Sequence, residues 1–114
     1  MRAETGLQVD ILAELDKRGL WGVHVPNGAV FAGDARQRAI QSNSLKRAGM
    51  RPGFPDLLVY GPQGVGHIEV KIEGEYATDL QMEIEHKLTG WGQRYAVCRS
   101  VADVAETLED WGWS

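Results

Sequence analysis

Apolar residues recur every three or four positions in three stretches of this chain, residues 4–18, 79–89 and 101–110. That spacing places them on one side of an α-helix, so each stretch is predicted to form an amphipathic helix. The side chains expected to face the core are Leu7, Ile11, Leu12 and Leu15, then Leu80, Ile84 and Leu88, then Val101, Val104, Ala105 and Leu108. Glycine follows the first two stretches, as is common where helices end.

Polar residues mark where these helices begin. Thr78 is a candidate N-cap for the second, and Ser100 opens a capping-box-like sequence before the third. A fourth helix is predicted over residues 34–48, with Asp34 as its N-cap. The sequence Ser42-Asn43-Ser44 weakens the middle of this helix, so a break or a mobile stretch is expected there.

Four short, mostly apolar runs predict β-strands, at residues 20–25, 56–60, 67–72 and 93–98. The second and third strands are separated by the glycine-rich residues 61–66. A connection this short implies an antiparallel hairpin, because a parallel crossover needs about a dozen residues or more. The helix between the third and fourth strands allows a right-handed crossover and parallel pairing.

The predicted element order is therefore α-β-α-β-β-α-β-α. This order favours an α/β fold with a mixed central β-sheet flanked by helices. A length of 114 residues suits one compact domain, so residues 1–114 are expected to form a single unit.

Three charged residues interrupt the apolar hairpin strands, namely Asp56, Glu69 and Lys71. Because side chains alternate along a strand, Glu69 and Lys71 point to one face while Val70 points to the other. If the two strands pair, Asp56 comes near both of them. Two bare carboxylates this close repel each other, and one is pushed towards protonation. A divalent cation removes that repulsion, and oxygen ligands of this type suit Mg²⁺.

The residues around this cluster resemble a known family. Pro55-Asp56 followed by Glu69-Val70-Lys71 resembles the signature of PD-(D/E)XK nucleases. The lead-in Gly49-Met50-Arg51-Pro52-Gly53-Phe54-Pro55-Asp56-Leu57, the upstream His24-Val25-Pro26-Asn27 and the downstream Gln81 resemble the virus-type replication-repair nuclease (VRR-NUC) version. The resemblance spans roughly residues 4–105 and implies a restriction-endonuclease-like core.

The resemblance implies hydrolysis of phosphodiester bonds with Mg²⁺ or Mn²⁺ as cofactor. Asp56, Glu69 and the backbone carbonyl of Val70 would bind the metal. Lys71 would orient the attacking water or stabilise developing negative charge. Gln81 would face the metal site and support this geometry, with an exposed helix glutamine as the alternative.

Three further residues have two open interpretations each. Glu4 stands four positions before Gln8 on the first helix, where many of these nucleases place an extra acidic group near the metal; plain solvent exposure is the alternative. His24 and Asn27 fall in a region that lies close to the active-site rim in this family, so they are candidates for contact with substrate. A lone histidine in a strand is more often a structural hydrogen-bonding residue.

The net charge of −4 argues against a general nucleic-acid binder, but the charge is unevenly distributed. Residues 34–52 hold five basic residues against Asp34 alone, a net charge of +4 that leaves −8 for the rest. These basic residues are Arg36, Arg38, Lys46, Arg47 and Arg51. Beside a nuclease motif they are candidate contacts to DNA phosphates, whereas without it a solvated helix face is the simpler interpretation.

The sequence has no apolar run near the roughly 18 residues that span a membrane. Residues 1–6 have no apolar signal core, so a cytoplasmic location is expected, and the family resemblance adds a bacterial or phage-infected host. The single cysteine, Cys98, is expected to be a buried, inert thiol. Trp111 and Trp113 are expected to pack locally, with a dimer contact as the alternative.

These features together predict a metal-dependent, structure-selective DNA endonuclease. Stand-alone members of the family are associated with cutting branched DNA, including Holliday junctions, and a small domain of this kind suggests a symmetric homodimer. Alternatives are a nicking or flap-type nuclease and a non-catalytic DNA-binding module that keeps the fold. The intact acidic and lysine positions count against the binding module. A purely structural ion-pair cluster would be costly to keep without a metal.

Overall fold

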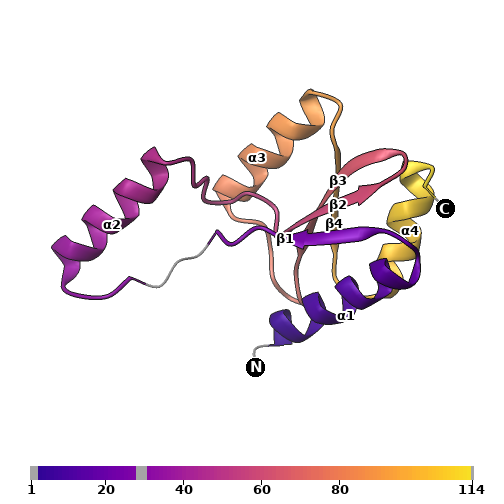
Figure 1. Ribbon diagram of the computed structural model, residues 1–114, viewed down its shortest axis with the longest axis horizontal. Coiled ribbons are helices and arrows are strands. Elements are labelled where there is room, and N and C mark those ends of the chain that lie inside the picture. The colour runs from indigo at the N-terminus through magenta and orange to yellow at the C-terminus, as the bar shows by residue number, and fades with distance from the viewer. Residues whose placement is uncertain (1–2, 28–30, 114) are drawn as a thin grey trace.

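The computed structural model of the protein describes residues 3–27 and 31–113. Figure 1 shows the helices and strands that these residues form. Their bounds are α1 Ala3–Lys17, β1 Trp21–His24, α2 Ala35–Arg47, β2 Leu57–Gly61, β3 Gly64–Val70, α3 Asp79–Gly90, β4 Arg94–Cys98 and α4 Ala102–Trp111. The order confirms the predicted succession of elements and the α/β class.

The four strands form one sheet in the order β1-β2-β3-β4. Strand β2 pairs antiparallel with both β1 and β3, whereas β3 and β4 are parallel. Helix α3 connects the parallel pair, as the crossover argument predicted. The sheet is therefore mixed, as expected for a restriction-endonuclease-like core.

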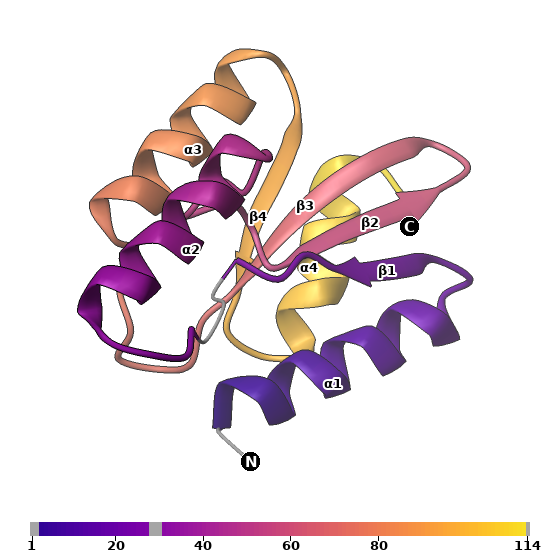
Figure 2. The ribbon, with the colours of Figure 1, turned by 60° about the vertical axis from the view of Figure 1, so that its left-hand side comes forward.

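Helices cover both faces of the sheet, but unequally (Figure 2). On one face, Leu12 and Leu15 of α1 approach Gly22 on β1, and Trp111 of α4 approaches Gly66 on β3. Helix α3 lies on the opposite face and, among the described elements, packs only on β4. The core between the sheet, α1 and α4 consists of Ile11, Leu15, Leu20, Leu57, Val59, Ile68, Val70, Cys98, Val104, Leu108 and Trp113.

Two predicted core positions are wrong. Leu80 is exposed, and the buried residue of α3 is Leu88 near the other end of the same apolar stripe. Ala105 is also exposed, and Thr107 is buried on α4 instead. The Thr107 hydroxyl lies 3.5 Å from Sγ of Cys98, which is buried as predicted.

The β2–β3 hairpin is tighter than predicted. Strand β3 begins at Gly64, so a two-residue turn, Pro62-Gln63, joins the strands in place of the six residues 61–66. Gly66 faces α4, and a side chain there would overlap the Trp111 ring. This glycine therefore makes room for a partner within a strand, although the sequence analysis placed it in the glycine-rich connection 61–66.

The C-terminal tryptophans pack within their own chain. The rings of Trp111 and Trp113 meet edge to face with centroids 5.1 Å apart. Trp113 is buried, and the Arg94 guanidinium lies 5.1 Å from the centroid of its ring. Local packing is confirmed, and the alternative of a dimer contact is wrong for Trp113 because its own chain already covers the ring.

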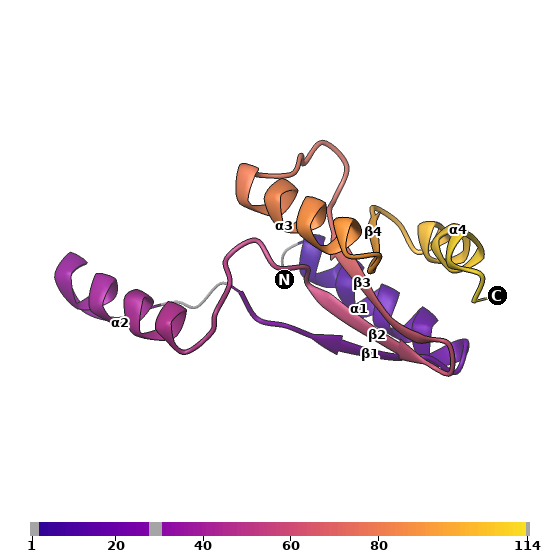
Figure 3. The same cartoon turned by 90° about the horizontal axis from the view of Figure 1, so that it is seen from above.

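Helix α2 stands clear of the rest of the molecule (Figure 3). None of its residues is buried, and it contacts no other described helix or strand. Asp34 caps it in a reciprocal capping box with Gln37, which confirms the predicted cap. The helix runs unbroken through Ser42-Asn43-Ser44, so the predicted break is wrong. Serine and asparagine each cost only about 0.5 kcal/mol relative to alanine, which is too little to interrupt a capped helix.

The other predicted helix starts lie close to the observed ones. Thr78 caps α3 in a capping box with Gln81. Before α4, the Ser100 hydroxyl accepts a hydrogen bond from the Asp103 N–H at 3.2 Å. The Asp103 carboxylate accepts from the Arg99 N–H, so the reciprocal half of that box is not made with Ser100.

Candidate active site

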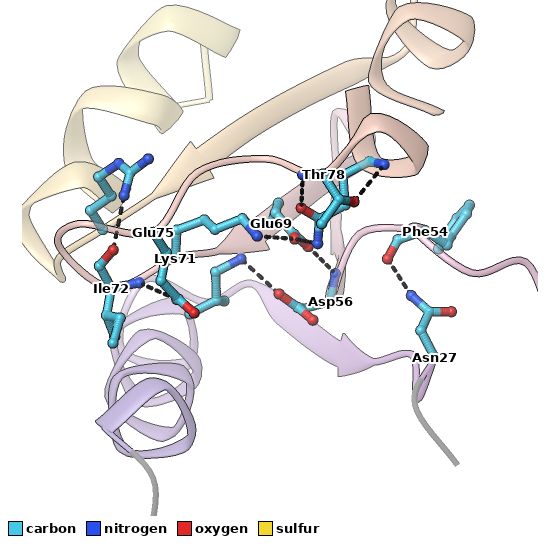
Figure 4. A network of polar contacts seen from close by, with 11 residues as sticks. Asn27, Phe54, Asp56, Glu69, Lys71, Ile72, Glu75 and Thr78 are labelled. Carbon is cyan, nitrogen blue, oxygen red and sulfur yellow. Dashed lines mark hydrogen bonds and ion pairs between the residues drawn. The ribbon is translucent and has the colours of Figure 1, made fainter. Parts of the chain in front are cut away.

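Asp56 lies at the entry to β2, directly after the buried Pro55. Its backbone carbonyl accepts a hydrogen bond from the Val25 N–H at 2.8 Å, which ties this position to the end of β1. Its Oδ2 accepts from the Val70 N–H at 2.8 Å, and its own N–H donates to Glu69 Oε1 at 3.2 Å. The carboxylate is thus fixed beside the end of β3 (Figure 4).

Glu69 lies near the end of β3, and Lys71 is the first residue after this strand. The two side chains share one face of the strand, as the alternation predicted. Both are buried, with 3% of Glu69 and 7% of Lys71 exposed. Lys71 Nζ lies 3.6 Å from Glu69 Oε2. The fold therefore brings Asp56, Glu69 and Lys71 together in one cluster, in which Glu69 and Lys71 are buried and Asp56 is half-buried.

Gln81 joins this cluster to the start of α3. Its Oε1 accepts from the Thr78 N–H at 3.0 Å, while its Nε2 donates to Glu69 Oε2 at 2.6 Å. One amide group therefore caps the helix and holds the buried carboxylate. Gly53 lets the preceding loop approach this helix start, because a Cβ there would stand 2.8 Å from the Leu80 carbonyl carbon.

The pKa of Glu69 is raised to about 8. Burial is the largest cause, because removal of water disfavours the charged carboxylate. The adjacent Asp56 carboxylate raises the pKa further through a shared hydrogen bond and through repulsion, and Lys71 offsets only part of this. A cation held between the two carboxylates would act in the opposite direction.

A second pair of carboxyl groups, Glu4 and Glu75, lies beside the cluster. The pKa of Glu4 is raised by burial, then by the neighbouring Glu75, then by Asp56. Glu75 Oε1 accepts from the Ile72 N–H at 3.0 Å, and this hydrogen bond is the main cause of a lowered Glu75 pKa. Glu4 therefore lies beside the cluster, in the region where the family resemblance placed an extra acidic group. Glu75 was missed, and its only sequence signal is a glycine-containing turn shortly after Lys71.

The carboxylates of Asp56 and Glu69 fit a hard divalent cation. Among the described residues, no three histidine, cysteine or carboxylate side chains converge as they would in a closed metal cage. Mg²⁺ does not need such a cage, because it keeps several waters and uses only one or two protein carboxylates. The ligand roles of Glu4 and of the Val70 carbonyl stay predictions.

His24 and Asn27 support the loop that leads into Asp56. His24 Nδ1 lies 3.0 Å from the Asp56 carbonyl oxygen and donates to it in the Nδ1–H tautomer. The Asn27 side-chain amide donates to the Phe54 carbonyl. Asn27 and Phe54 also line a pocket of about 260 Å³. His24 and Asn27 therefore both have structural roles at the rim of the site, and their contact with substrate stays a prediction.

The basic residues lie outside the carboxylate cluster. Four stand on α2 and the fifth follows it, in the order Arg36, Arg38, Lys46, Arg47 and Arg51, and all are exposed. Arg38 donates to the Gly33 carbonyl at 2.8 Å, and Arg51 donates to the Lys46 carbonyl at 3.0 Å. The structure thus places the candidate phosphate contacts on the projecting segment 34–52, the α2 arm, and not around the carboxylates.

Comparison with known proteins gives the family. The sequence pattern of the VRR-NUC domain matches residues 2–102. The chain belongs to the VRR-NUC domain family. A solved structure titled "VRR_NUC domain" is 21% identical over 93% of this chain and 94% of that chain, with a TM-score of 0.67. Another, titled "VRR_NUC domain protein", is 21% identical over 96% and 88%, with a TM-score of 0.68.

At this identity the two structures establish the shared fold of the VRR-NUC domain. A search of curated proteins finds no match. The family is a nuclease family, which confirms the resemblance drawn from the sequence motifs. Within the described part of the VRR-NUC domain, no helix has the length and apolar character needed to cross a membrane.

Proposed function

We propose that this VRR-NUC domain is a metal-dependent DNA endonuclease whose active site is the Asp56–Glu69–Lys71 cluster. The observation that carries the proposal is a buried carboxylate, Glu69, in contact with the half-buried Asp56 carboxylate and with the buried ammonium group of Lys71. A buried charge cluster is costly for a fold to keep. The raised pKa of Glu69 supports the proposal, because it reflects the free-energy cost of a charged carboxylate at this site beside Asp56, and a bound cation would offset that cost.

Asp56 and Glu69 would hold Mg²⁺ or Mn²⁺, with the Val70 carbonyl as a further ligand and Glu4 nearby. When bound, such a metal lowers the pKa of a coordinated water and stabilises charge on phosphate oxygens. Lys71 holds its ammonium group beside Glu69, where it can orient the attacking water or stabilise negative charge. The amide of Gln81 keeps Glu69 Oε2 in place.

The proposed substrate is branched DNA, such as a Holliday junction, cut by a homodimer. The exposed cations of the α2 arm support phosphate contacts that recognise DNA shape, because phosphate contacts position a protein without reading sequence. Two active sites related by a two-fold axis suit a substrate with the same symmetry. Flap or nicking activity would use the same chemistry on another DNA structure.

Cleavage of labelled DNA tests this proposal. A four-way junction, a flap, a linear duplex and a single strand would be compared with Mg²⁺, Mn²⁺ or EDTA. Wild type is expected to cut the junction symmetrically with either metal and to be inactive with EDTA. Lys71→Ala is expected to lose about 100-fold or more in rate, as when a transition-state donor is removed. Lys87→Ala, on the exposed surface of α3, is the matched control and is expected to keep full activity.

Each outcome of this assay has a distinct meaning. Equal cutting of all substrates would leave a nuclease and remove the junction assignment. No cutting of any substrate, with wild type and Lys71→Ala binding DNA equally, would contradict the nuclease proposal and favour a non-catalytic DNA-binding module.

A further inference from the structure

The exposed helix α2 has an uncharged side that its own chain leaves uncovered. Both of its large apolar residues are open to solvent, with Ile40 57% and Leu45 40% exposed. They belong to a set with the helical spacing of a packing face, namely Gln37, Ile40, Gln41, Ser44, Leu45 and the C-cap Ala48. The basic residues of the helix, Arg36, Arg38, Lys46 and Arg47, all fall outside this arc.

A helix of this length needs a packing partner. Isolated helices shorter than about 12–15 residues are marginal in water, and most helical stability in proteins comes from packing of one face. Helix α2 has 13 residues and packs on no other described element of its own chain. Its uncharged side offers DNA no cation, so a protein surface is the better fit for that side.

A surface of matching character lies on the sheet. On the face opposite α1 and α4, Trp21 and Tyr60 stand side by side, with ring centroids 5.7 Å apart. Strand pairing places Val65 next to Tyr60, and Leu58 next to Val23, on this same face. Trp21 is 66% exposed. The helix on this face, α3, packs only on β4 among the described elements, so it leaves the β1–β2 part uncovered.

Charge also matches between the arm and this face. Residues 34–52 carry a net charge of +4, while the rest of the chain carries −8. Helix α3, on the same face as Trp21 and Tyr60, bears Asp79, Glu83 and Glu85. If the cationic arm lay on this face of another copy, its positive charge would be attracted to these carboxylates. That attraction would speed association and help to fix the alignment of the two copies.

We infer that the uncharged side of α2 docks on the β1–β2 face of a second copy of this chain, with the two arms exchanged about a two-fold axis. Such a contact is used twice, once for each arm, which doubles the buried area of a single helix. It leaves the cations of α2 at the edges of the interface and outside the apolar contact. The inference rests on the proposed homodimer and is independent of the proposed cleavage.

Sedimentation velocity over a range of protein concentrations tests the inference without any activity measurement. Wild type is expected to be a dimer at micromolar concentration. Ile40→Gln/Leu45→Gln and, separately, Trp21→Ser are each expected to raise the dimer dissociation constant at least 10-fold. Val9→Gln, on the exposed side of α1, is the control and is expected to stay dimeric. Circular dichroism is expected to show a folded domain in every variant, because none of these positions is in the core.

Three results would overturn the inference. The first is a wild type that stays monomeric up to about 100 μM. The second is an Ile40→Gln/Leu45→Gln variant that stays dimeric. This result would overturn the inference even if the variant bound DNA more weakly. The third is dissociation by the α2 variant but not by Trp21→Ser, which would remove the assigned docking face.

Discussion

Glu69 shows how one buried residue links fold and chemistry. It accepts a hydrogen bond from Gln81, lies against Lys71 and shares its surroundings with Asp56. Its position was predictable, because the alternation of a strand and the pairing of a hairpin bring the three charges together. The position of Gln81 beside this cluster was also predictable, from the family motif. The neighbouring Glu75 was not, since its place depends on how a turn folds back towards α1.

The raised pKa of Glu69 predicts that metal-free stability depends on pH. Between about pH 4.5 and pH 8 the folded protein keeps a proton on Glu69 that the unfolded chain releases. The free energy of unfolding is therefore expected to fall as the pH rises through this window, by up to about 5 kcal/mol. Urea unfolding in EDTA at pH 5.5 and pH 8 measures the change.

Glu69→Gln removes the titrating group, so this part of the pH dependence is expected to disappear in that variant. Glu83→Gln, at an exposed position on α3, is the control and is expected to keep it. A wild type and a Glu69→Gln variant with the same pH slope would show that another group is responsible.

The double role of Gln81 can be divided by mutation. Thr78→Ala removes the side-chain half of the cap but keeps the N–H that holds Gln81 beside Glu69. It is expected to lower stability by about 1 kcal/mol and to leave cleavage nearly unchanged. Gln81→Ala is expected to lose the reciprocal half of the cap, the bond from the Thr78 N–H, and also to reduce the cleavage rate. Equal cleavage rates for the two variants, measured at matched folded fractions, would limit Gln81 to capping.

At the scale of elements, periodicity and connection lengths were enough to predict the order of helices and strands and the mixed sheet. They failed where the structural role of a residue depends on a partner far away in the sequence. Gly66 resembled a loop residue until Trp111, far along the chain, was seen to occupy the space of its side chain. Leu80 continued an apolar stripe on a helix of which Leu88 is the buried residue.

Gly66→Ala is expected to destabilise the protein by about 1–3 kcal/mol, because the added methyl group displaces the Trp111 ring from a packed site. Thermal and urea unfolding measure this loss. In the double variant with Trp111→Leu, the effect of the alanine is expected to shrink, because the two sites are in contact. Gly90→Ala, with no atom near the added methyl group, is the control and is expected to be neutral or stabilising. Strict additivity of Gly66→Ala and Trp111→Leu would contradict this packing account.

At the scale of the whole molecule, charge and shape are divided between two parts. An acidic body contains the carboxylate cluster, and a basic arm projects from it, giving a molecule of 48 × 34 × 26 Å. The sequence showed this division of charge, but not that the basic segment would stand apart as a helix with both sides open. That arrangement follows from the absence of any residue on α2 that its own chain buries.

The arm predicts how DNA binding depends on salt. Arg36→Gln/Arg47→Gln removes two cations that are exposed on α2. The variant is expected to bind junction DNA more weakly and with a shallower dependence on salt, because fewer counterions are released on binding. Fluorescence anisotropy at several salt concentrations measures both. Unchanged affinity and slope would place the phosphate contacts elsewhere on the protein.

The central claim, a metal site formed by Asp56 and Glu69, is tested most directly by binding of Mn²⁺ to the protein, followed by electron paramagnetic resonance. Wild type and Lys71→Ala are both predicted to bind the ion, because the role proposed for the lysine is in the chemistry and not as a metal ligand. Asp56→Asn and Glu69→Gln are predicted to lose this binding. A wild type that binds no Mn²⁺ at saturating concentration, or a Glu69→Gln variant that binds it equally well, would contradict the account.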